Sequence, residues 1–502
     1  MDTADTVWMD NLSAKAMSSC QVDSSLYMRY DVKRGLRDVS GKGVLAGLTT
    51  IGEVQAHTGS DDPSAPGPGN LIYRGIPIAE IVSGFLSDGR CGFEEVCYLL
   101  LFNELPDRAE LDRFQALLAS LRPLPDDFIH DSILKLSSRD VMNAMAQTVL
   151  QLYVLDENAE AADIPNVLRQ CLRLIAAFPL VAAYSYRAHA YRYGNKSLII
   201  HQVRPDLPTA ANFLHLLRDD GRFTELEAQM LDLSLVLHAE HGGGNNSSFT
   251  THVVTSSGTD TYSAITAAMG SLKGYRHGGA NVKVVMMLED LKREVDDWND
   301  DEKLERHLTR ILNKETFDRT GLIYGFGHAV YSVSDPRAII LREQVGKLAA
   351  EQGRTGEYEL YRKVETIAPR VISHNRKMYK GVSANVDFYS GFLYSLLNIP
   401  TELFTPLFAL ARIAGWSAHR IEELANGGKI IRPAYKSVAA RREYLRLGQR
   451  TCPPPGVFTS CKLDLKSSLQ LTGLRVAGLR FTRLAVHKAY GLHGLRFTKP
   501  GR

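Results

Sequence analysis

The sequence predicts a mainly α-helical protein of more than one lobe, with a few short strands near its N-terminus. Its 502 residues are too many for one small domain. Apolar residues recur at three- and four-residue spacing along most of the chain, as they do in amphipathic helices. Alternation typical of strands is confined to residues 43–75, and the sequence contains no repeat of fixed period.

The composition is that of a soluble globular protein, with 44% hydrophobic and 23% charged residues. No stretch resembles a membrane span of about 18 apolar residues, so we expect no membrane partner. The first 16 residues carry three aspartates, which is typical of neither a signal peptide nor a transit peptide. The six cysteines have no C-x-x-C spacing, so we expect reduced thiols and a cytoplasmic location.

The basic charge is concentrated at the C-terminus. Residues 445–502 contain eleven Lys and Arg and one Asp, a net charge of +10, against +3 for the whole chain. The remainder therefore carries about −7, and we expect no nucleic-acid partner. This tail has weak helical periodicity, and we expect it to be disordered. A partner-binding segment and a shifted reading frame near Tyr444 are the alternatives.

The strands and helices are predicted in order along the chain. Residues 42–56 and 70–75 predict short strands on either side of a loop rich in Gly, Pro, Ser and Asp. Asp335 followed by Pro336 predicts the N-cap and first residue of a later helix. Helical spacing predicts further helices over 93–105, 108–121, 138–155, 164–191, 209–220, 225–241, 259–274 and 280–298.

One polar cluster, HAEHGGGNNSSF, lies at the end of a predicted helix. His238 and His241 are three residues apart and share one face of that helix end. Two histidines beside a glutamate suggest zinc, but the sequence lacks the H-E-x-x-H order and an obvious third ligand. We therefore expect no metal here and favour a substrate contact where the helix opens into the glycines.

Two more histidines lie next to glycines. His277 stands before two glycines at the start of a helix, where glycines allow close approach and backbone N–H groups are unpaired. A plain loop between two helices is the alternative. His328 follows glycines, and Arg337 lies nine residues later in the first turn of a helix, where solvation at the surface is the alternative.

Three further residues stand out from their surroundings. Asp387 lies between apolar residues at the start of a helical pattern, where capping the helix is the alternative to catalysis. Arg412 lies inside the apolar sequence LFALARIAGW, where a buried charge needs a partner. Arg432 stands before a proline in KIIRPAYKS.

Five stretches together resemble the citrate synthase family, including its 2-methylcitrate synthase branch. They occur in the family's order, and the resemblance covers roughly residues 43–444. It implies a mainly α, two-domain homodimer with its active site in the cleft between a large domain (1–277 and 396–444) and a small domain (278–395), followed by the tail 445–502. The stretches are HAEHGGGNNSSF, GYRHGGANVKV, GFGHAVYSVSDPRAIILRE, NVDFYSGFLYSLLNIPTELFTPLFALARIAGW and KIIRPAYKS.

The resemblance implies condensation of acetyl-CoA with oxaloacetate to give citrate and CoA, a reaction of the tricarboxylic acid cycle. Asp387 would take a proton from the carbon next to the thioester carbonyl. His277 would donate a hydrogen bond to the enolate that forms, and the positive end of the helix beginning near Ala280 would favour its neutral ring. His328 would donate to the ketone oxygen of oxaloacetate.

Two substrate carboxylates need planar, bidentate cations. The resemblance assigns this role to Arg337, Arg412 and Arg432, with His241 as a further substrate contact. The arginine matching Arg432 reaches into the partner subunit's site in the family.

A coenzyme A thioester is the expected co-substrate, with no tightly bound cofactor. It would pass Tyr324 and Gly325, with Lys380 as a phosphate contact. The alternatives are a 2-methylcitrate synthase using propionyl-CoA and a non-catalytic module that senses citrate or CoA. A sensing module would be expected to lose Asp387 or a histidine first, and all are present. The tail departs from the family's usual ending, which puts a C-terminal embrace between subunits in doubt.

Overall fold

The computed structural model describes residues 3–38, 43–56, 67–376 and 381–450. Its contacts divide the chain into Met1–Arg432, which holds the helices α1 to α18, and Pro433–Arg502. Within the second unit, the described residues 433–450 have no regular structure apart from one 3₁₀ turn, η5 (Leu447–Gln449). The predicted disorder of the tail falls mostly on residues outside the described ranges and stays a prediction.

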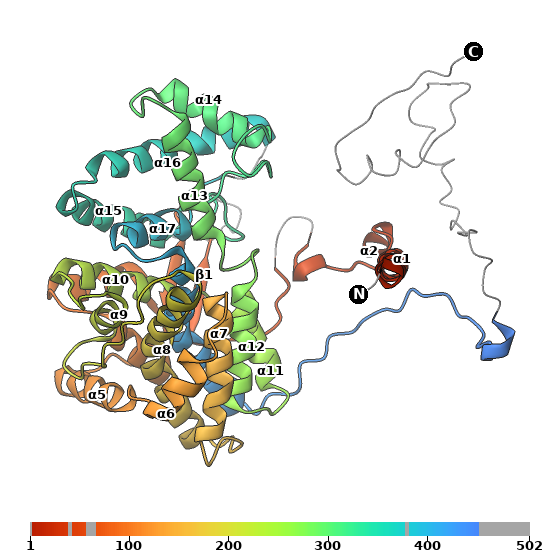
Figure 1. The fold of residues 1–502 in the computed structure, drawn as a ribbon, viewed down its shortest axis with the longest axis horizontal. Coiled ribbons are helices and arrows are strands. Elements are labelled where there is room, and N and C mark those ends of the chain that lie inside the picture. The colour runs from red at the N-terminus through yellow and green to blue at the C-terminus, as the bar shows by residue number, and fades with distance from the viewer. Residues whose placement is uncertain (1–2, 39–42, 57–66, 377–380, 451–502) are drawn as a thin grey trace. The chain divides into compact units, whose positions relative to one another are not determined.

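Helices make up almost all of the regular structure, as the sequence predicted (Figure 1). Each of the eight ranges predicted from apolar spacing contains a helix. The helices are α1 (Thr3–Ser19), α2 (Ser25–Arg29), α3 (Ile78–Ser87), α4 (Phe93–Phe102), α5 (Arg108–Leu121), α6 (Asp126–Phe128), α7 (Val141–Gln151), α8 (Ile164–Tyr193), α9 (Thr209–Leu217), α10 (Glu225–His238), α11 (Asn246–Thr255), α12 (Thr261–Lys273), α13 (Ala280–Glu294), α14 (Asp301–Leu312), α15 (Pro336–Glu351), α16 (Thr355–Arg376), α17 (Val386–Leu396) and α18 (Phe404–Ala425).

The strands form one small antiparallel sheet in the order β1-β2-β3, with β1 (Gly52–Gln55), β2 (Asn70–Tyr73) and β3 (Ile76–Pro77). Gly52 pairs with Tyr73, and Ile72 pairs with Pro77. The predicted strand over 42–56 is shorter than expected. Its described residues 44–50 are exposed and have no strand beside them, apart from an isolated bridge between Gly43 and Arg37.

Helix α8 is the longest helix of the described chain, with 30 residues. By length and apolar composition it is long enough to cross a membrane, which the sequence reading had not recognised. However, 83% of its most apolar 18-residue window is buried inside the fold. It packs against α5, α7, α9 and α18, so it has the surroundings of a core helix.

Helix α18 is the element that positions the site. It packs against α4, α8, α10, α11 and α12, and Phe404 to Arg420 are buried apart from one position. Helices α13 to α17 pack mainly on one another, and α15 and α17 also contact α10. This group, at the top of Figure 1, spans nearly the range 278–395 implied for a small domain. That it acts as a separate domain stays a prediction.

Candidate active site

The turn after α10 carries His241 and is fixed by a tyrosine from the sheet. The Tyr73 hydroxyl lies 3.0 Å from the carbonyl oxygens of both Val236 and Glu240 and accepts the Glu240 N–H at 3.2 Å. His238, the last residue of α10, donates its Nδ1–H to the Ser234 carbonyl at 2.6 Å. These hydrogen bonds between side chains and backbone hold the end of α10, and with it the turn that carries His241.

Arg412 lies inside α18 and is 2% exposed, as its apolar surroundings predicted. Its Nε donates to the His238 carbonyl at 2.9 Å, and its guanidinium lies over the Phe408 ring at 5.8 Å. The buried charge therefore has a backbone acceptor at the end of α10. This contact ties the helix of Arg412 to the turn of His241.

Arg337 is not a surface residue, so the alternative of solvation is wrong. It is 4% exposed, and its Nε and Nη2 bind the two oxygens of Asp335 at 3.0 and 2.8 Å. Asp335 caps α15 through the Arg337 N–H, as predicted. Its second oxygen also accepts the Val386 N–H at 3.1 Å. One carboxylate thus links the starts of α15 and α17.

Asp387 does not cap its helix. Asn385 is the N-cap of α17, and its side-chain oxygen accepts the Asp387 N–H at 3.1 Å. Burial raises the pKa of the Asp387 carboxyl group to about 6, although Arg337 and Arg412 act in the opposite direction. The capping alternative is therefore excluded, and Asp387 is left with an unusually basic carboxylate.

His328 has one defined tautomer. Its Nδ1 accepts the backbone N–H groups of Val330 at 3.1 Å and Tyr331 at 3.2 Å. An acceptor nitrogen carries no proton, so the ring proton of neutral His328 lies on Nε2. The ring stacks on Tyr331 at 4.5 Å between centroids and meets the edge of His241 at 5.1 Å.

His277 lies in a tight turn, and packing requires the first of its two glycines, Gly278. A Cβ at Gly278 would lie 2.6 Å from the Leu272 carbonyl oxygen, so only glycine fits there. The His277 Nδ1 lies 3.2 Å from the Ser271 carbonyl, which places the proton of a neutral ring on Nδ1. Burial, followed by the charge of Arg412, lowers the pKa of His277 to about 4. Burial and Arg412 therefore favour the neutral ring. Helix α13 does begin at Ala280, and its predicted contribution to the neutral ring stays a prediction.

Two buried arginines connect these residues electrostatically. Burial lowers the pKa of His241 well below its ordinary value, and Arg337, His328 and Arg412 lower it further. Arg337 and Arg412 also act on Asp387, and Arg412 acts on His277. The structure thus brings together His241, His277, His328, Arg337, Asp387 and Arg412, all of them proposed from the sequence.

The other predicted residues have different surroundings, and one lies outside the described ranges. Arg432 is exposed, and no hydrogen bond or ion pair of its side chain is found in the described part of the chain. Tyr324 donates its hydroxyl to Asp318 at 2.7 Å, with Lys283 over its ring. Gly325 has φ +83°, and its carbonyl accepts the Asn385 N–H at 2.9 Å. Lys380 lies outside the described residues.

Sequence reasoning missed a buried cluster beneath the site. His252, His419 and Glu422 offer ligand atoms within 4.8 Å of one another, the only such group among the described residues able to hold a metal ion. His419 also lies 3.1 Å from Glu240. The available signals were Glu240 between two site histidines and His419 in an apolar helix. The sequence reading instead weighed zinc at His238 and His241.

Known proteins of one family resemble this chain along most of its length. Residues 37–434 match the family model for the citrate synthase C-terminal domain. The citrate synthase of Synechocystis sp. is 35% identical over 401 residues, which cover 78% of this chain and 88% of that protein. The 2-methylcitrate synthase of Shewanella oneidensis is 32% identical over 403 residues, which cover 79% of this chain and 96% of that protein.

Solved structures agree with this match. The citrate synthase of Thermoplasma acidophilum, in a ternary complex with carboxymethyl coenzyme A and oxaloacetate, is 25% identical with a TM-score of 0.66. The match covers 83% of this chain and 99% of the Thermoplasma acidophilum chain. The citrate synthase of Thermotoga maritima is 28% identical with a TM-score of 0.62, and the match covers 82% of this chain and 98% of that chain.

Proposed function

The chain belongs to the citrate synthase family of acyltransferases, and from this premise we propose that it condenses acetyl-CoA with oxaloacetate and water to give citrate and CoA. The observation that carries the proposal is that two buried guanidinium groups, Arg337 and Arg412, both act electrostatically on the carboxyl group of Asp387. A dicarboxylate held by these cations would lie next to a base. The ternary complex of the Thermoplasma acidophilum relative supports the same pair of substrates.

The first step is removal of a proton from the methyl carbon of the acetyl thioester. Asp387 accepts this proton, and its raised pKa makes it a stronger base than an exposed aspartate. Neutral His277 donates a hydrogen bond to the thioester oxygen as the enolate forms. Because its Nδ1–H faces Ser271, this donation requires the ring to turn away from that carbonyl.

In the second step the enolate carbon attacks the ketone carbon of oxaloacetate. The ketone oxygen becomes negative, and His328 donates to it through Nε2–H, the tautomer that its two backbone contacts favour. The product is citryl-CoA. Water then cleaves the thioester bond, which releases citrate and free CoA.

Arg337, Arg412 and His241 hold the oxaloacetate in this scheme. Nη1 of Arg337 is the part of its guanidinium that does not face Asp335, and Arg412 uses only Nε for the His238 carbonyl. Both groups therefore keep N–H donors for a substrate carboxylate. Arg432 completes the site of the partner subunit in a cytoplasmic homodimer. Coenzyme A passes Tyr324 and Gly325 and reaches Lys380, with no tightly bound cofactor.

The second candidate is 2-methylcitrate synthesis from propionyl-CoA, which the Shewanella oneidensis relative favours. The substrates differ by one methylene group, worth about 1–3 kcal/mol in an apolar pocket. We therefore expect both thioesters to react.

The test is release of free CoA thiol by the purified protein without added metal. Thiol should appear from acetyl-CoA only when oxaloacetate is present. Release without oxaloacetate would identify a plain thioesterase and contradict the proposal. Comparing kcat/KM for acetyl-CoA and propionyl-CoA then assigns the preferred thioester.

A further inference from the structure

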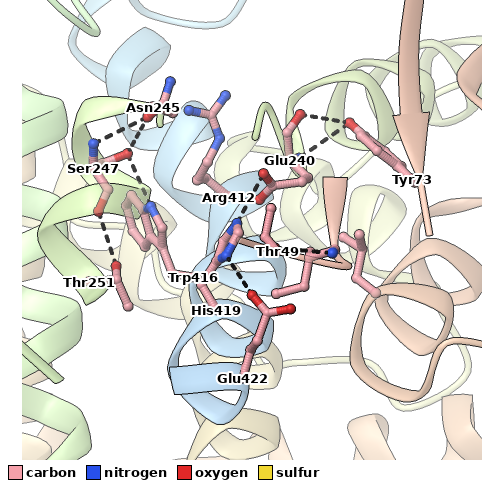
Figure 2. Close-up of polar contacts among 12 residues, drawn as sticks. Thr49, Tyr73, Glu240, Asn245, Ser247, Thr251, Arg412, Trp416, His419 and Glu422 are labelled. Atoms are coloured by element: carbon pink, nitrogen blue, oxygen red, sulfur yellow. Dashed lines mark hydrogen bonds and ion pairs between the residues drawn. The ribbon is translucent and has the colours of Figure 1, made fainter. Parts of the chain in front are cut away.

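Two opposite charges are completely buried beneath Arg412. Glu240 and His419 are both 0% exposed, and His419 Nε2 lies 3.1 Å from Glu240 Oε1 (Figure 2). Arg412, Gly415 and His419 lie at i, i+3 and i+7 on α18, so they share the helix face that meets the turn after α10. Helix α18 therefore presents two side chains to the same turn: Arg412, which is proposed to bind the substrate, and His419, which lies inside the fold.

The Glu240 carboxylate is confined between two glycines. A Cβ at Gly415 would overlap its Oε2, and a Cβ at Gly52 would lie 2.8 Å from its Cγ. Its backbone is held by Tyr73. The Glu240 side chain therefore has little room to turn toward another partner while His419 is present.

Glu240 is also an available counter-charge for Arg412. The negative charge of Glu240 raises the pKa of Arg412 against the effect of burial. Yet no ion pair joins the two side chains in the described part of the molecule, and Figure 2 shows the Arg412 guanidinium extending past Glu240. If Glu240 paired with Arg412, it would compete with a substrate carboxylate.

His419 is surrounded by acceptors that favour its cation. Its Nδ1 lies 3.0 Å from His252 Nε2 and 3.8 Å from Glu422 Oε2, while His252 Nδ1 lies 2.8 Å from Glu423. Glu422 is itself held by the Thr50 N–H at 2.8 Å. Although burial lowers the pKa of His419, Glu240 and Glu422 raise it to about 9.

We propose that His419 is a positioning residue that takes up the charge of Glu240 and so keeps the Arg412 guanidinium available for a carboxylate of the substrate. The inference rests on the proposed function, because it concerns the dicarboxylate of that reaction. His419 touches no substrate and acts only through Glu240 and Arg412. Without its cation, the buried carboxylate would turn its charge toward Arg412.

The test compares His419→Gln, Glu240→Gln and the double variant. For His419→Gln we expect the KM for oxaloacetate to rise about tenfold or more, with the KM for acetyl-CoA unchanged. Glu240→Gln should bind oxaloacetate no more weakly than the natural protein. The double variant should recover most of the affinity lost in His419→Gln, because the competing charge is gone. A double variant as weak as His419→Gln would overturn the inference, since a purely structural pair gives that result.

The matched control is His307→Gln. His307 is also a buried histidine near a carboxylate, 3.4 Å from Asp290, but it lies on α14 away from α10 and α18. The His307→Gln variant should leave the KM for oxaloacetate unchanged. Calorimetric titration with oxaloacetate accompanies the kinetics. A chain that binds oxaloacetate but releases no thiol would refute the proposed function without touching this inference.

Glu240→Gln alone tests the inference if His419→Gln fails to fold. Because this variant removes the competing carboxylate, the KM for oxaloacetate should stay the same or fall, and a tenfold rise would contradict the inference. Stoichiometric bound zinc in the purified protein would also overturn it, because His419 would then be a neutral ligand. The charged and titratable groups around the pair are Tyr73, Arg74, His241, His252, Arg412, Glu422 and Glu423.

Discussion

Asp387 shows how strongly surroundings decide the role of a residue. From its position in the sequence alone Asp387 was better explained as a helix cap, and only the family resemblance implied that it is a base. The structure gives the capping role to Asn385 and leaves Asp387 with a pKa of about 6. The identity of the residue was predictable, whereas its chemical state depends on burial that only the folded chain creates.

Asp387→Asn should lower kcat by about 10²–10⁴-fold and leave oxaloacetate binding nearly unchanged, because the amide keeps the shape but cannot accept the proton. Burial raises the pKa of Asp387, so above about pH 6 the folded state carries the full cost of the buried, ionised carboxylate, which Asn removes. The melting temperature at pH 7 should therefore not fall. Thiol release and thermal unfolding measure the two quantities, and turnover close to that of the natural protein would refute the assignment.

In the natural protein kcat/KM should fall as the pH drops below about 6, since protonated Asp387 cannot act as a base. His277 and His241, with pKa values lowered by burial, should stay neutral through this range. A pH–rate profile of the unliganded enzyme checks the expectation. An acid limb that instead appears above pH 7 would point to a histidine as the base.

Arg337→Lys and Arg412→Lys keep the charge but lose the planar fork. Hydrogen bonds to charged groups are worth about 1.5–3 kcal/mol, so the affinity for oxaloacetate should fall about ten- to a hundredfold. The KM for acetyl-CoA should change much less. Equal weakening of both substrates would mean that the arginine supports the fold instead of the dicarboxylate.

At the scale of elements, Asp335 joins two helices that carry site residues. Its carboxylate caps α15, binds Arg337 through both oxygens and accepts the Val386 N–H of α17. The sequence predicted the cap from Asp335 and Pro336, since capping depends on neighbours in the chain. It did not predict the link to α17, because the partners lie 51 residues apart.

Asp335→Asn should destabilise the protein by about 3–5 kcal/mol, because Arg337 would keep a buried charge without its partner. The cap itself should survive, since Asn is as good an N-cap as Asp. Asp300→Asn is the matched control, because Asp300 caps α14 through the Glu302 and Lys303 N–H groups and binds no buried arginine. Thermal or urea unfolding should show a large loss only for Asp335→Asn. Equal, small losses in both variants would show that the ion pair contributes little.

The same distinction between local and distant contacts explains which helices and strands could be predicted from the sequence. Not every helix was predicted: α1, α2, α3, α6, α11, α14 and α16 were not. In α14 the buried Leu304, Leu308 and Ile311 do recur at helical spacing, so that pattern was present and was overlooked, whereas α11 is rich in Ser and Thr. The strand over 42–56 was predicted too long, because β1 extends only where β2 lies beside it. The Glu240–His419 pair joins residues 179 positions apart, so the sequence marked each residue but not their contact.

At the scale of the whole molecule, the position of Arg432 bears on assembly. The six candidate carboxylate-binding and acid–base residues His241, His277, His328, Arg337, Asp387 and Arg412 are buried or half-buried, but Arg432 is exposed at the end of the first unit. Its side chain has no hydrogen bond or ion pair within the described part of the chain. The family resemblance assigns it to the partner subunit, and the family match ends two residues later, at residue 434.

Mixing two inactive variants tests this assignment. Arg432→Ala and Asp387→Asn should each be nearly inactive as homodimers. If Arg432 serves the partner's site, a hybrid dimer carries both defects in one site and leaves the other site intact. Unfolding and refolding the two variants together at equal amounts should then restore about a quarter of the natural activity, since half of the dimers are hybrids with one working site. Each variant refolded alone is the control. If Arg432 serves its own chain, every site in a hybrid still lacks one group, and no activity should return.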